Sequence, residues 1–558
     1  MLFLNFGLSC YAQNFQLKII GISSKENKVI DSLNYNFNHK NAKSISDEIN
    51  NVAATLSKIG YIDNQIVENS KVNDSSFTAK ISLGKRIKFI HINIGRNSDL
   101  NDLISIDRKN DTLIIPYNEV ESFLNGSLQK LERKGFALAK LKLINIYKQK
   151  ETLYADLKYE SGKQRVLNSV VIKYADNNKK NRFPDGHLTQ INNKYHNSTF
   201  NQDVVRKIHD DFAKFSFVNQ IKYPEILFTK DTTKVYVYLE KRKANTFDGF
   251  IGFANNGNNK LTFNGYLDLA LENTLKVGEQ FSIYWKSDGN NQKTFRASLE
   301  IPYLFKSPIG IKAQLHIFKQ DSIFQNTKTS IDLGYLINFN TSFYLGYQST
   351  ESSDIQNTNS TTISDYNNSF ITGNLEYSKF DYSKSTFPKK TNFSLIMGIG
   401  KRTTTDLPET VATSKQFYIN LKAMHIFYLN EKNCININYQ NYYLESDSYI
   451  VNELYRFGGI NSIRGFAENS LQASFMNAII TEYRYIISPD LYIHSIMDYV
   501  YFQDNSTKKS GNLFGFGMGL GLQTKNGLLR LALSNGSTKN QHVKFYNTII
   551  TICYNVKF

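Results

Sequence analysis

The stretch Tyr455-Arg-Phe-Gly-Gly-Ile-Asn-Ser-Ile-Arg-Gly-Phe466 decides how the C-terminal half of this 558-residue chain is interpreted. It lies in a long polar connection, residues 445–472, and places two glycine groups around one arginine. The next segment, residues 477–487, alternates like a β-strand and carries an acid and a base on one face. From there the alternation continues to a terminal aromatic residue, Phe558. The stretch therefore predicts a specialised loop in front of a wall of strands.

The composition suits a multidomain protein and excludes a bundle of membrane-spanning helices. A chain of 558 residues is too long for one ordinary domain. Its mean hydropathy is -0.39, and it has no apolar run long enough for a transmembrane helix. A transmembrane β-barrel is compatible with these values, because only every second residue of its strands faces lipid.

The net charge of +17 raises the question of an anionic partner. The basic residues are scattered through the chain and form no run. We therefore expect solvated faces and contacts with an anionic membrane surface, and no nucleic-acid partner.

The first twelve residues are apolar and end in Cys10-Tyr11-Ala12, a pattern that suits cleavage before Gln13. We interpret residues 1–12 as a signal peptide, although a basic start is missing; the alternative is a buried N-terminal strand. The other cysteines, Cys434 and Cys553, are too few for a disulfide framework and lack C-x-x-C spacing. No metal and no cofactor is predicted.

Residues 14–242 contain a unit that occurs three times. Each copy has apolar residues at helical spacing, followed by a small residue and an aromatic: Gly60-Tyr61, Gly135-Phe136 and the degenerate Ser216-Phe217. Ser44 with Asp47 predicts the start of the first helix. A strand opens each unit (15–20, 88–94, 166–174), and another closes it (77–83, 152–159, 234–239). The predicted order is strand, helices, strand, strand; an unrelated α+β repeat array would share this order.

From about residue 243 the helical period gives way to alternation. Leu267 and Leu269 fall on one face of a strand and Asp268 on the other. A polar face of this kind suits a hydrated lumen, while the apolar face meets lipid. About sixteen such segments predict a closed, even-numbered barrel, because an open edge in lipid would leave backbone groups unpaired. A soluble β-sandwich is the alternative, but its inner faces should be less polar.

The connections between these segments alternate in length, as in barrels with short periplasmic turns and long outer loops. The short connections are residues 338–340, 429–433, 488–490 and 524–527, and the long ones are residues 348–368, 401–416, 445–472 and 503–512.

Two further motifs are explained by ordinary strand structure. The glycine row at residues 515–521 superficially resembles a phosphate loop, but its period of two makes one smooth strand face with room for an inserted loop. The last segment places Ile550 and Ile552 outward, in line with its final aromatic residue. Neither H-E-x-x-H nor G-x-S-x-G occurs, so we do not expect an enzyme.

The loop and the repeats together resemble the BamA/TamA family of outer-membrane assembly proteins. The family has an (I/V)-R-G-(F/Y) loop tip, which matches Ile463, Arg464, Gly465 and Phe466, and its periplasmic POTRA modules resemble the three repeats. The resemblance implies α+β POTRA repeats followed by an all-β 16-stranded antiparallel transmembrane barrel. The expected domains are a signal peptide (1–12), three POTRA modules (13–84, 85–162, 163–242) and the barrel (243–558). Three modules and this length are more similar to TamA than to BamA.

The resemblance also implies a site inside the barrel. Arg464 corresponds to the loop tip that meets an aspartate of the wall, here Asp498, with Glu482 and Arg484 beside it. Gly458 and Gly459 are the loop glycines. Two departures concern Asp498: the residue before it is methionine, and the family's glycine after it is absent. The terminal stripe of Tyr554, Val556 and Phe558 resembles the C-terminal signal by which barrels are recognised.

The function implied is insertion or translocation of client polypeptides at the outer membrane, with the modules in the periplasm. The modules would add client strands to their sheets, and a seam between the first strand (247–253) and the last (543–558) would open. The partners implied are outer-membrane lipid, unfolded client proteins and a TamB-like periplasmic protein. The alternatives are a two-partner secretion pore, a passive outer-membrane channel and a soluble adhesive or structural repeat protein.

Overall fold

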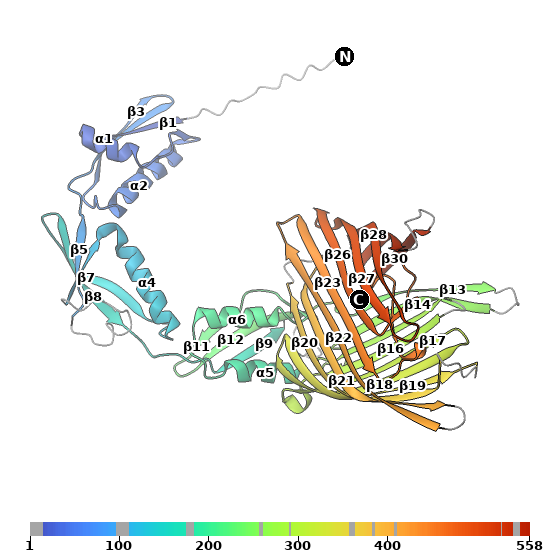
Figure 1. Ribbon diagram of the computed structural model, residues 1–558. Helices are drawn as coiled ribbons and strands as arrows, with labels where there is room; N and C mark the ends of the chain where they lie inside the picture. The colour runs from blue at the N-terminus through green and yellow to red at the C-terminus, as the bar shows by residue number, and fades with distance from the viewer. Residues whose placement is uncertain are drawn as a thin grey trace, which may run out of the picture. The chain divides into compact units, whose positions relative to one another are not determined.

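The computed structural model describes residues 15–95, 111–174, 183–255, 261–288, 292–356, 363–381, 386–406, 410–525, 527–539 and 547–558. The chain divides into two compact units. One holds the first two α/β modules, and the other holds most of the third module together with a barrel (Figure 1). The predicted signal peptide lies outside the described residues. No described helix is both long and apolar enough to cross a membrane.

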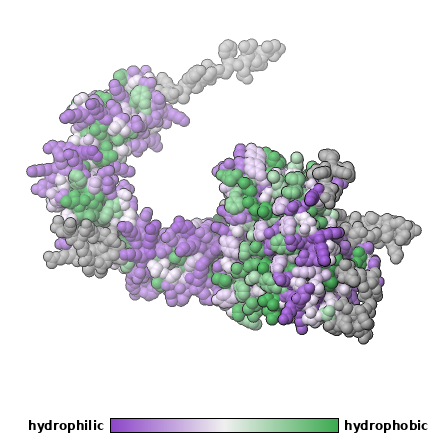
Figure 2. Space-filling view, in the orientation of Figure 1, coloured by the Kyte–Doolittle hydropathy of each residue, from purple (hydrophilic) through white to green (hydrophobic). Residues whose placement is uncertain are grey.

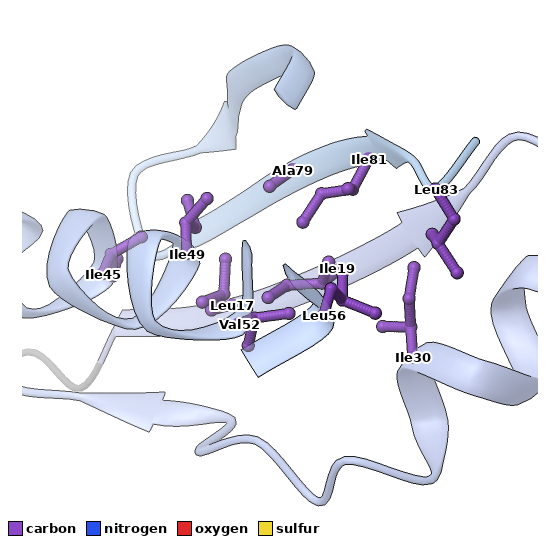
Figure 3. Close-up of a cluster of buried hydrophobic side chains, with 10 residues drawn as sticks. All are labelled: Leu17, Ile19, Ile30, Ile45, Ile49, Val52, Leu56, Ala79, Ile81 and Leu83. Atoms are coloured by element: carbon purple, nitrogen blue, oxygen red, sulfur yellow. The ribbon is translucent and has the colours of Figure 1, made fainter. Parts of the chain in front are cut away.

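The first module packs two helices on one sheet. Its elements are β1 (Phe15–Gly21), α1 (Ser24–Asp31), β2 (Asn38–His39), α2 (Ala42–Lys58), β3 (Gln65–Asn73) and β4 (Ser76–Ser82). The sheet order is β2-β1-β4-β3, with β1 parallel to β4. The apolar stripe of α2 covers Leu17 and Ile19 of β1 and Ile81 of β4 (Figure 3). Helical spacing on one element and alternation on the other therefore bury one common core.

The start of α2 differs from the prediction. The N-cap is Asn41, whose side chain accepts a hydrogen bond from the Ser44 amide at 2.8 Å, so Ser44 lies inside the helix. A true capping box occurs at Ser23 and Glu26, at the start of the unpredicted helix α1. The predicted helix end is correct: Gly60 has φ +109°, a conformation that favours glycine.

The second module has the same sheet plan, with one α-helix among its described residues. Its elements are β5 (Phe89–Asn93), β6 (Thr112–Pro116), η1 (Tyr117–Glu119), α4 (Val120–Arg133), β7 (Lys140–Gln149) and β8 (Thr152–Glu160). The sheet order is β6-β5-β8-β7, with β5 parallel to β8. In both modules a long antiparallel strand, β3 or β7, forms one edge of the sheet.

The third module comprises β9 (Ser169–Tyr174), α5 (Asp185–Tyr195), α6 (Gln202–Phe212), β10 (Val218–Gln220), β11 (Glu225–Phe228) and β12 (Thr233–Lys241). Helix α6 ends at Phe212, four residues before the degenerate pair Ser216-Phe217 that was predicted to follow it. Asp211 is buried and accepts from Lys194, Tyr195 and Lys214. Burial alone would raise the pKa of Asp211, but these hydrogen bonds outweigh it and lower the pKa.

The third module also contacts the barrel's turns. The ring of His187, on α5, lies edge-on to Tyr303 with centroids 4.7 Å apart, and Phe215 packs on Phe339 at 5.4 Å. Burial lowers the pKa of His187 to about 3, so the imidazole is neutral in this contact. These contacts place the short turn at residues 338–340 on the module's side of the barrel.

The C-terminal half is a closed barrel of sixteen antiparallel strands, as predicted. Its strands, each paired with the next and the last with the first, are β13 (Thr246–Asn255), β14 (Leu261–Glu272), β15 (Gln280–Asp288), β16 (Gln292–Ile301), β17 (Ile309–Gln320), β18 (Phe324–Asn338), β19 (Thr341–Asp354), β20 (Tyr366–Phe380), β21 (Lys389–Asp406), β22 (Thr410–Tyr428), β23 (Asn433–Ser446), β26 (Phe475–Ser488), β27 (Leu491–Asp504), β28 (Lys509–Thr524), β29 (Gly527–Thr538) and β30 (Ile549–Lys557).

The outer wall of the barrel is apolar and the inner wall is polar. On β18, Ile331, Leu333 and Tyr335 are more than half exposed, whereas the alternate residues Ser330 and Asp332 are buried. Figure 2 shows apolar residues gathered over the barrel, in contrast to the mostly hydrophilic modules. Exposed apolar surface on this scale requires a non-aqueous neighbour, and a lipid bilayer supplies one.

Three predicted long loops are wrong in extent. Residues 503–512 were predicted as a loop, but β27 continues to Asp504 and β28 begins at Lys509. β19 continues to Asp354 and β20 begins at Tyr366, and β21 and β22 are separated by residues 407–409 alone. The strands therefore run deep into stretches that were assigned to loops. The reason is that a barrel strand continues beyond the lipid band, where both of its faces can be polar and alternation disappears.

Candidate functional site: the lumen loop and the barrel seam

A hairpin folds back into the lumen from the connection between β23 and β26. Its arms are β24 (Tyr455–Phe457) and β25 (Leu471–Ala473), which pair over three residues. At its turn, φ is +113° at Gly458 and +90° at Gly459. A Cβ atom at Gly458 would overlap the carbonyl oxygen of Ala467. Both glycines are therefore required for the loop to turn back on itself.

The loop tip is held by a bidentate contact between Arg464 and Asp498 of β27. The two residues are 4% and 3% exposed. The Arg464 backbone amide and Nε donate to Asp498 Oδ2 at 3.0 and 2.8 Å, and Nη2 donates to Oδ1 at 2.5 Å. Charge-assisted, bidentate hydrogen bonds of this kind are strong and directional. The structure thus brings together the two residues that the family resemblance paired.

A second carboxylate completes the surroundings of the guanidinium. Arg464 Nη1 donates to Glu482 Oε1 at 2.5 Å, and Nη2 also donates to the Thr481 carbonyl at 3.1 Å. Arg484 donates to Glu482 Oε2 from Nε at 2.8 Å and from Nη2 at 2.5 Å. Glu482 therefore contacts the tip directly, and Arg484 acts on it only through Glu482.

Glycines of the wall make room for the tip. A Cβ atom at Gly515, on β28, would overlap the Arg464 carbonyl oxygen. On β29, a Cβ atom at Gly536 would come within 2.5 Å of the Gly465 carbonyl oxygen and 2.7 Å of the Phe466 ring. The inward face of the glycine row is thus partly covered by the inserted loop. Gly536 was not recognised from the sequence, since a lone glycine in a strand carries little signal.

The apolar side chains of the tip form a small core with the wall. Ile463 is fully buried and belongs to one cluster with Phe457, Met476 and Val500. Phe466 packs at the margin of this cluster. The tip is therefore fixed by packing as well as by charge.

A second anchor, missed from the sequence, holds the base of the loop. Arg402 of β21 forms an ion pair with Glu453, in η3 (Val451–Glu453), and both side chains are nearly inaccessible to solvent. Gln416 of β22 donates to Glu453 Oε2 at 2.8 Å. Asn452 donates to the Ser352 hydroxyl of β19 at 2.8 Å. Ile450, Val451 and Leu454, apolar residues around Asn452 and Glu453 inside a loop, are the signal that could have indicated this buried turn.

The barrel closes through a short ladder. β13 and β30 pair at two positions, Thr246 with Lys557 and Phe247 with Val556. By comparison, β13 pairs with β14 at ten positions and β29 with β30 at eight. The Phe558 amide also donates to the Asn245 carbonyl at 3.0 Å. The first and last strands therefore form the weakest described joint of the wall, where the sequence had predicted a seam.

The predicted C-terminal signal residues lie on the last strand and just beyond it. Tyr554 is 38% exposed and Phe558 49% exposed, and both continue the outward stripe of Ile550 and Ile552. Val556 is half-buried and takes part in the seam. Among the described residues, no group of His, Cys, Asp and Glu side chains could hold a metal ion.

Comparisons with known proteins agree with the family resemblance at the level of fold. No protein-family model and no curated protein matches the sequence. Among solved structures, CdiB from Acinetobacter baumannii matches 85% of this chain and 90% of its own at 13% identity, with a TM-score of 0.50. CdiB from Escherichia coli matches over 91% and 98% at 11% identity, with a TM-score of 0.50. BamA from Haemophilus ducreyi lacking POTRA domains 1-3 covers 84% and 98% at 15% identity, with a TM-score of 0.48.

Proposed function

We propose that this chain is an outer-membrane protein that inserts or translocates client polypeptides, with its α/β modules in the periplasm. The observation that carries the proposal is the two-pair ladder between β13 and β30 in a wall whose other joints are much longer. A barrel that serves only as a pore gains nothing from a weak joint, because unpaired backbone groups in lipid are costly. A joint of this kind is useful where strands of another chain must enter.

The edge strands of the modules support the same proposal. β3 and β7 lie at sheet edges and carry exposed apolar side chains, including Val67 at 57% and Ile146 at 57%. Exposed edges are a hazard for a soluble domain unless something pairs with them. A client segment that adds a strand to such an edge would use both its backbone groups and its apolar surface.

The test is assembly of an unfolded barrel client by the full chain in lipid vesicles. Acceleration of client folding is the expected result. The chain lacking residues 14–162 should fold, as judged by heat-modifiable gel migration, yet assemble clients poorly. Full activity of this truncated chain would move client recognition to the barrel. Steady ion conductance without any effect on clients would indicate a passive channel, and export of one soluble protein would indicate a two-partner secretion pore.

The TamB-like partner and the closer likeness to TamA rest on module count and chain length alone. Co-purification of the full chain with a large periplasmic protein from native membranes would support the partner. The signal peptide, the domain boundaries and the role of the terminal stripe likewise stay predictions.

A further inference from the structure

Basic side chains gather around one cavity in the barrel lumen. Arg296 of β16, His316 of β17, Lys328 of β18 and Lys422 of β22 all line a space of about 300 Å³. These residues take no part in the contacts that hold the loop tip. The cavity therefore requires an explanation of its own.

The pairing register places three of these side chains directly opposite one another. Arg296 pairs with His316, and His316 pairs with Lys328. Direct partners on neighbouring antiparallel strands point to the same face, and like charges there are destabilising. Arg296 and Lys422 each repel the Lys328 ammonium group. If stability alone determined the sequence, like charges would not lie side by side on neighbouring strands.

The described acids near the row form no ion pair with it, including Asp268, which lines a neighbouring lumen space with Arg296, His316 and Lys328. Glu453 is taken up by Arg402, and Glu468 pairs with Lys286 at 3.1 Å. Asp332 attracts Lys328, but its carboxylate accepts from the hydroxyls of Ser330 and Thr372. Across the described ranges, Arg296, Lys328 and Lys422 form no ion pair within 4.0 Å. Within the described residues, these three cations therefore lack a direct ion-pair partner.

Three residues that line the same space each carry a buried polar atom without a partner. His316 Nε2, Asn368 Oδ1 and Gln416 Oε1 are shielded from solvent and have no hydrogen bond in the described structure. A buried polar atom without a partner is costly, which indicates that something else completes it. The His316 imidazole can donate an N–H to a ligand oxygen, whereas Asn368 Oδ1 and Gln416 Oε1 are acceptors, which the hydroxyl group of a protonated phosphate can satisfy.

We propose that this cavity is a binding site for a phosphate-type oxyanion. Such a ligand carries more than one negative charge and presents several acceptor oxygens. It can therefore accept charge-assisted hydrogen bonds from Arg296, Lys328 and Lys422 at the same time. A single carboxylate would neutralise only one of the cations. The phosphate can be free in solution or belong to a lipid headgroup, and the cavity chemistry is the same for both. The proposal is independent of client assembly.

The test is calorimetric titration of the full chain in detergent with inorganic pyrophosphate. Saturable binding that weakens with added salt is the expected result. Lys328→Gln and Lys422→Gln, examined separately, should each weaken binding about tenfold or more, because each removes one charge-assisted contact. Lys401→Gln is the matched control: Lys401 lies on β21, is exposed and does not line the cavity. It should bind as the wild type does.

A second titration distinguishes the two sources of phosphate. Short-chain phosphatidic acid, used below its micelle concentration, should compete with pyrophosphate if the cavity accepts a lipid headgroup. Failure to compete would assign the site to a soluble oxyanion. The proposal would be overturned if neither probe bound saturably, or if both cavity variants, still heat-modifiable on gels, bound as tightly as the Lys401→Gln control.

Discussion

The two sides of the barrel wall differ in how firmly their strands are joined. β21 and β22 pair at sixteen positions, whereas β13 and β30 pair at two. The lumen loop is attached to both sides: its base is bound to β21 through Arg402, and its tip to β27 through Asp498, three strands from the seam. The loop therefore connects the firmly paired part of the wall with the part near the seam, which we propose opens. Four changes should test this.

The largest effect is expected from locking the seam. Thr246→Cys with Lys557→Cys, in a Cys553→Ser background, places two thiols on directly paired residues, whose Cα atoms are typically about 4.5–5.5 Å apart and so within disulfide reach. We expect client assembly to be lost on oxidation and restored by reductant, because β13 and β30 could no longer part. Assembly rates before and after reduction are the measurement.

A crosslink in the firm wall is the control for that lock. Lys401 and Lys415 are paired on β21 and β22, so Lys401→Cys with Lys415→Cys should form a disulfide and leave assembly unchanged. Equal losses from both crosslinks would mean that the whole barrel must flex, and the seam would have no special role.

The next largest effect is expected at the loop tip. Arg464→Ala or Asp498→Ala leaves its partner buried and uncompensated, at a local cost of about 3 kcal/mol. Client assembly should fall in each variant while the barrel still inserts, and the double variant should be little worse than either. Limited proteolysis of the loop would report its release. Additive losses would mean that Arg464 and Asp498 do not act as one anchor. Glu482 would then be the residue expected to hold the loop tip.

A smaller effect on client assembly is expected at the base of the loop. Arg402→Ala breaks a buried ion pair of the same kind, at a local cost of about 3 kcal/mol, but on the wall that does not open. The loop base should become sensitive to protease while assembly falls less than in Arg464→Ala. If Arg402→Ala were the more damaging change, the loop would act mainly through the firm wall.

The smallest effect is expected from filling the space beneath the tip. Gly515→Ala adds a methyl group against the Arg464 carbonyl and should cost about 1–2 kcal/mol through overpacking. Gly511→Ala, on the same strand, meets only the Phe502 ring at 3.4 Å and should be close to neutral. The difference between the two variants in chemical unfolding measures how tightly the tip is seated. No difference would imply a mobile tip.

Local patterns in the sequence were sufficient for the existence of the strands and for the closed barrel, whereas the loop tip was identified through the family motif. Alternation such as Leu267, Asp268 and Leu269 depends on neighbouring residues only, so it can be recognised without a structure. The pairing of Arg464 with Asp498 was reached through a family resemblance, because nothing local links residues on separate elements.

The rest depended on information that is not local. The pair of Arg402 and Glu453 joins segments far apart in the sequence, and each residue alone looks like an ordinary polar residue of a loop. The helix start at Asn41 in place of Ser44 was missed because several residues there suit an N-cap and backbone geometry selects one. The row of Arg296, His316 and Lys328 exists only once strand register is known.

The contact between the Phe558 amide and the Asn245 carbonyl has a consequence for the order of folding. Its two residues stand at opposite ends of the barrel sequence, so it joins the most distant partners in the sheet, and the entropy lost on bringing them together is correspondingly large. Such a contact forms late, after the local hairpins. Until this contact has formed, the sheet is open and has two unpaired edge strands, β13 and β30. During its own biogenesis, this chain must therefore pass through a state with unpaired sheet edges. This is the same state that we propose it resolves in its client proteins.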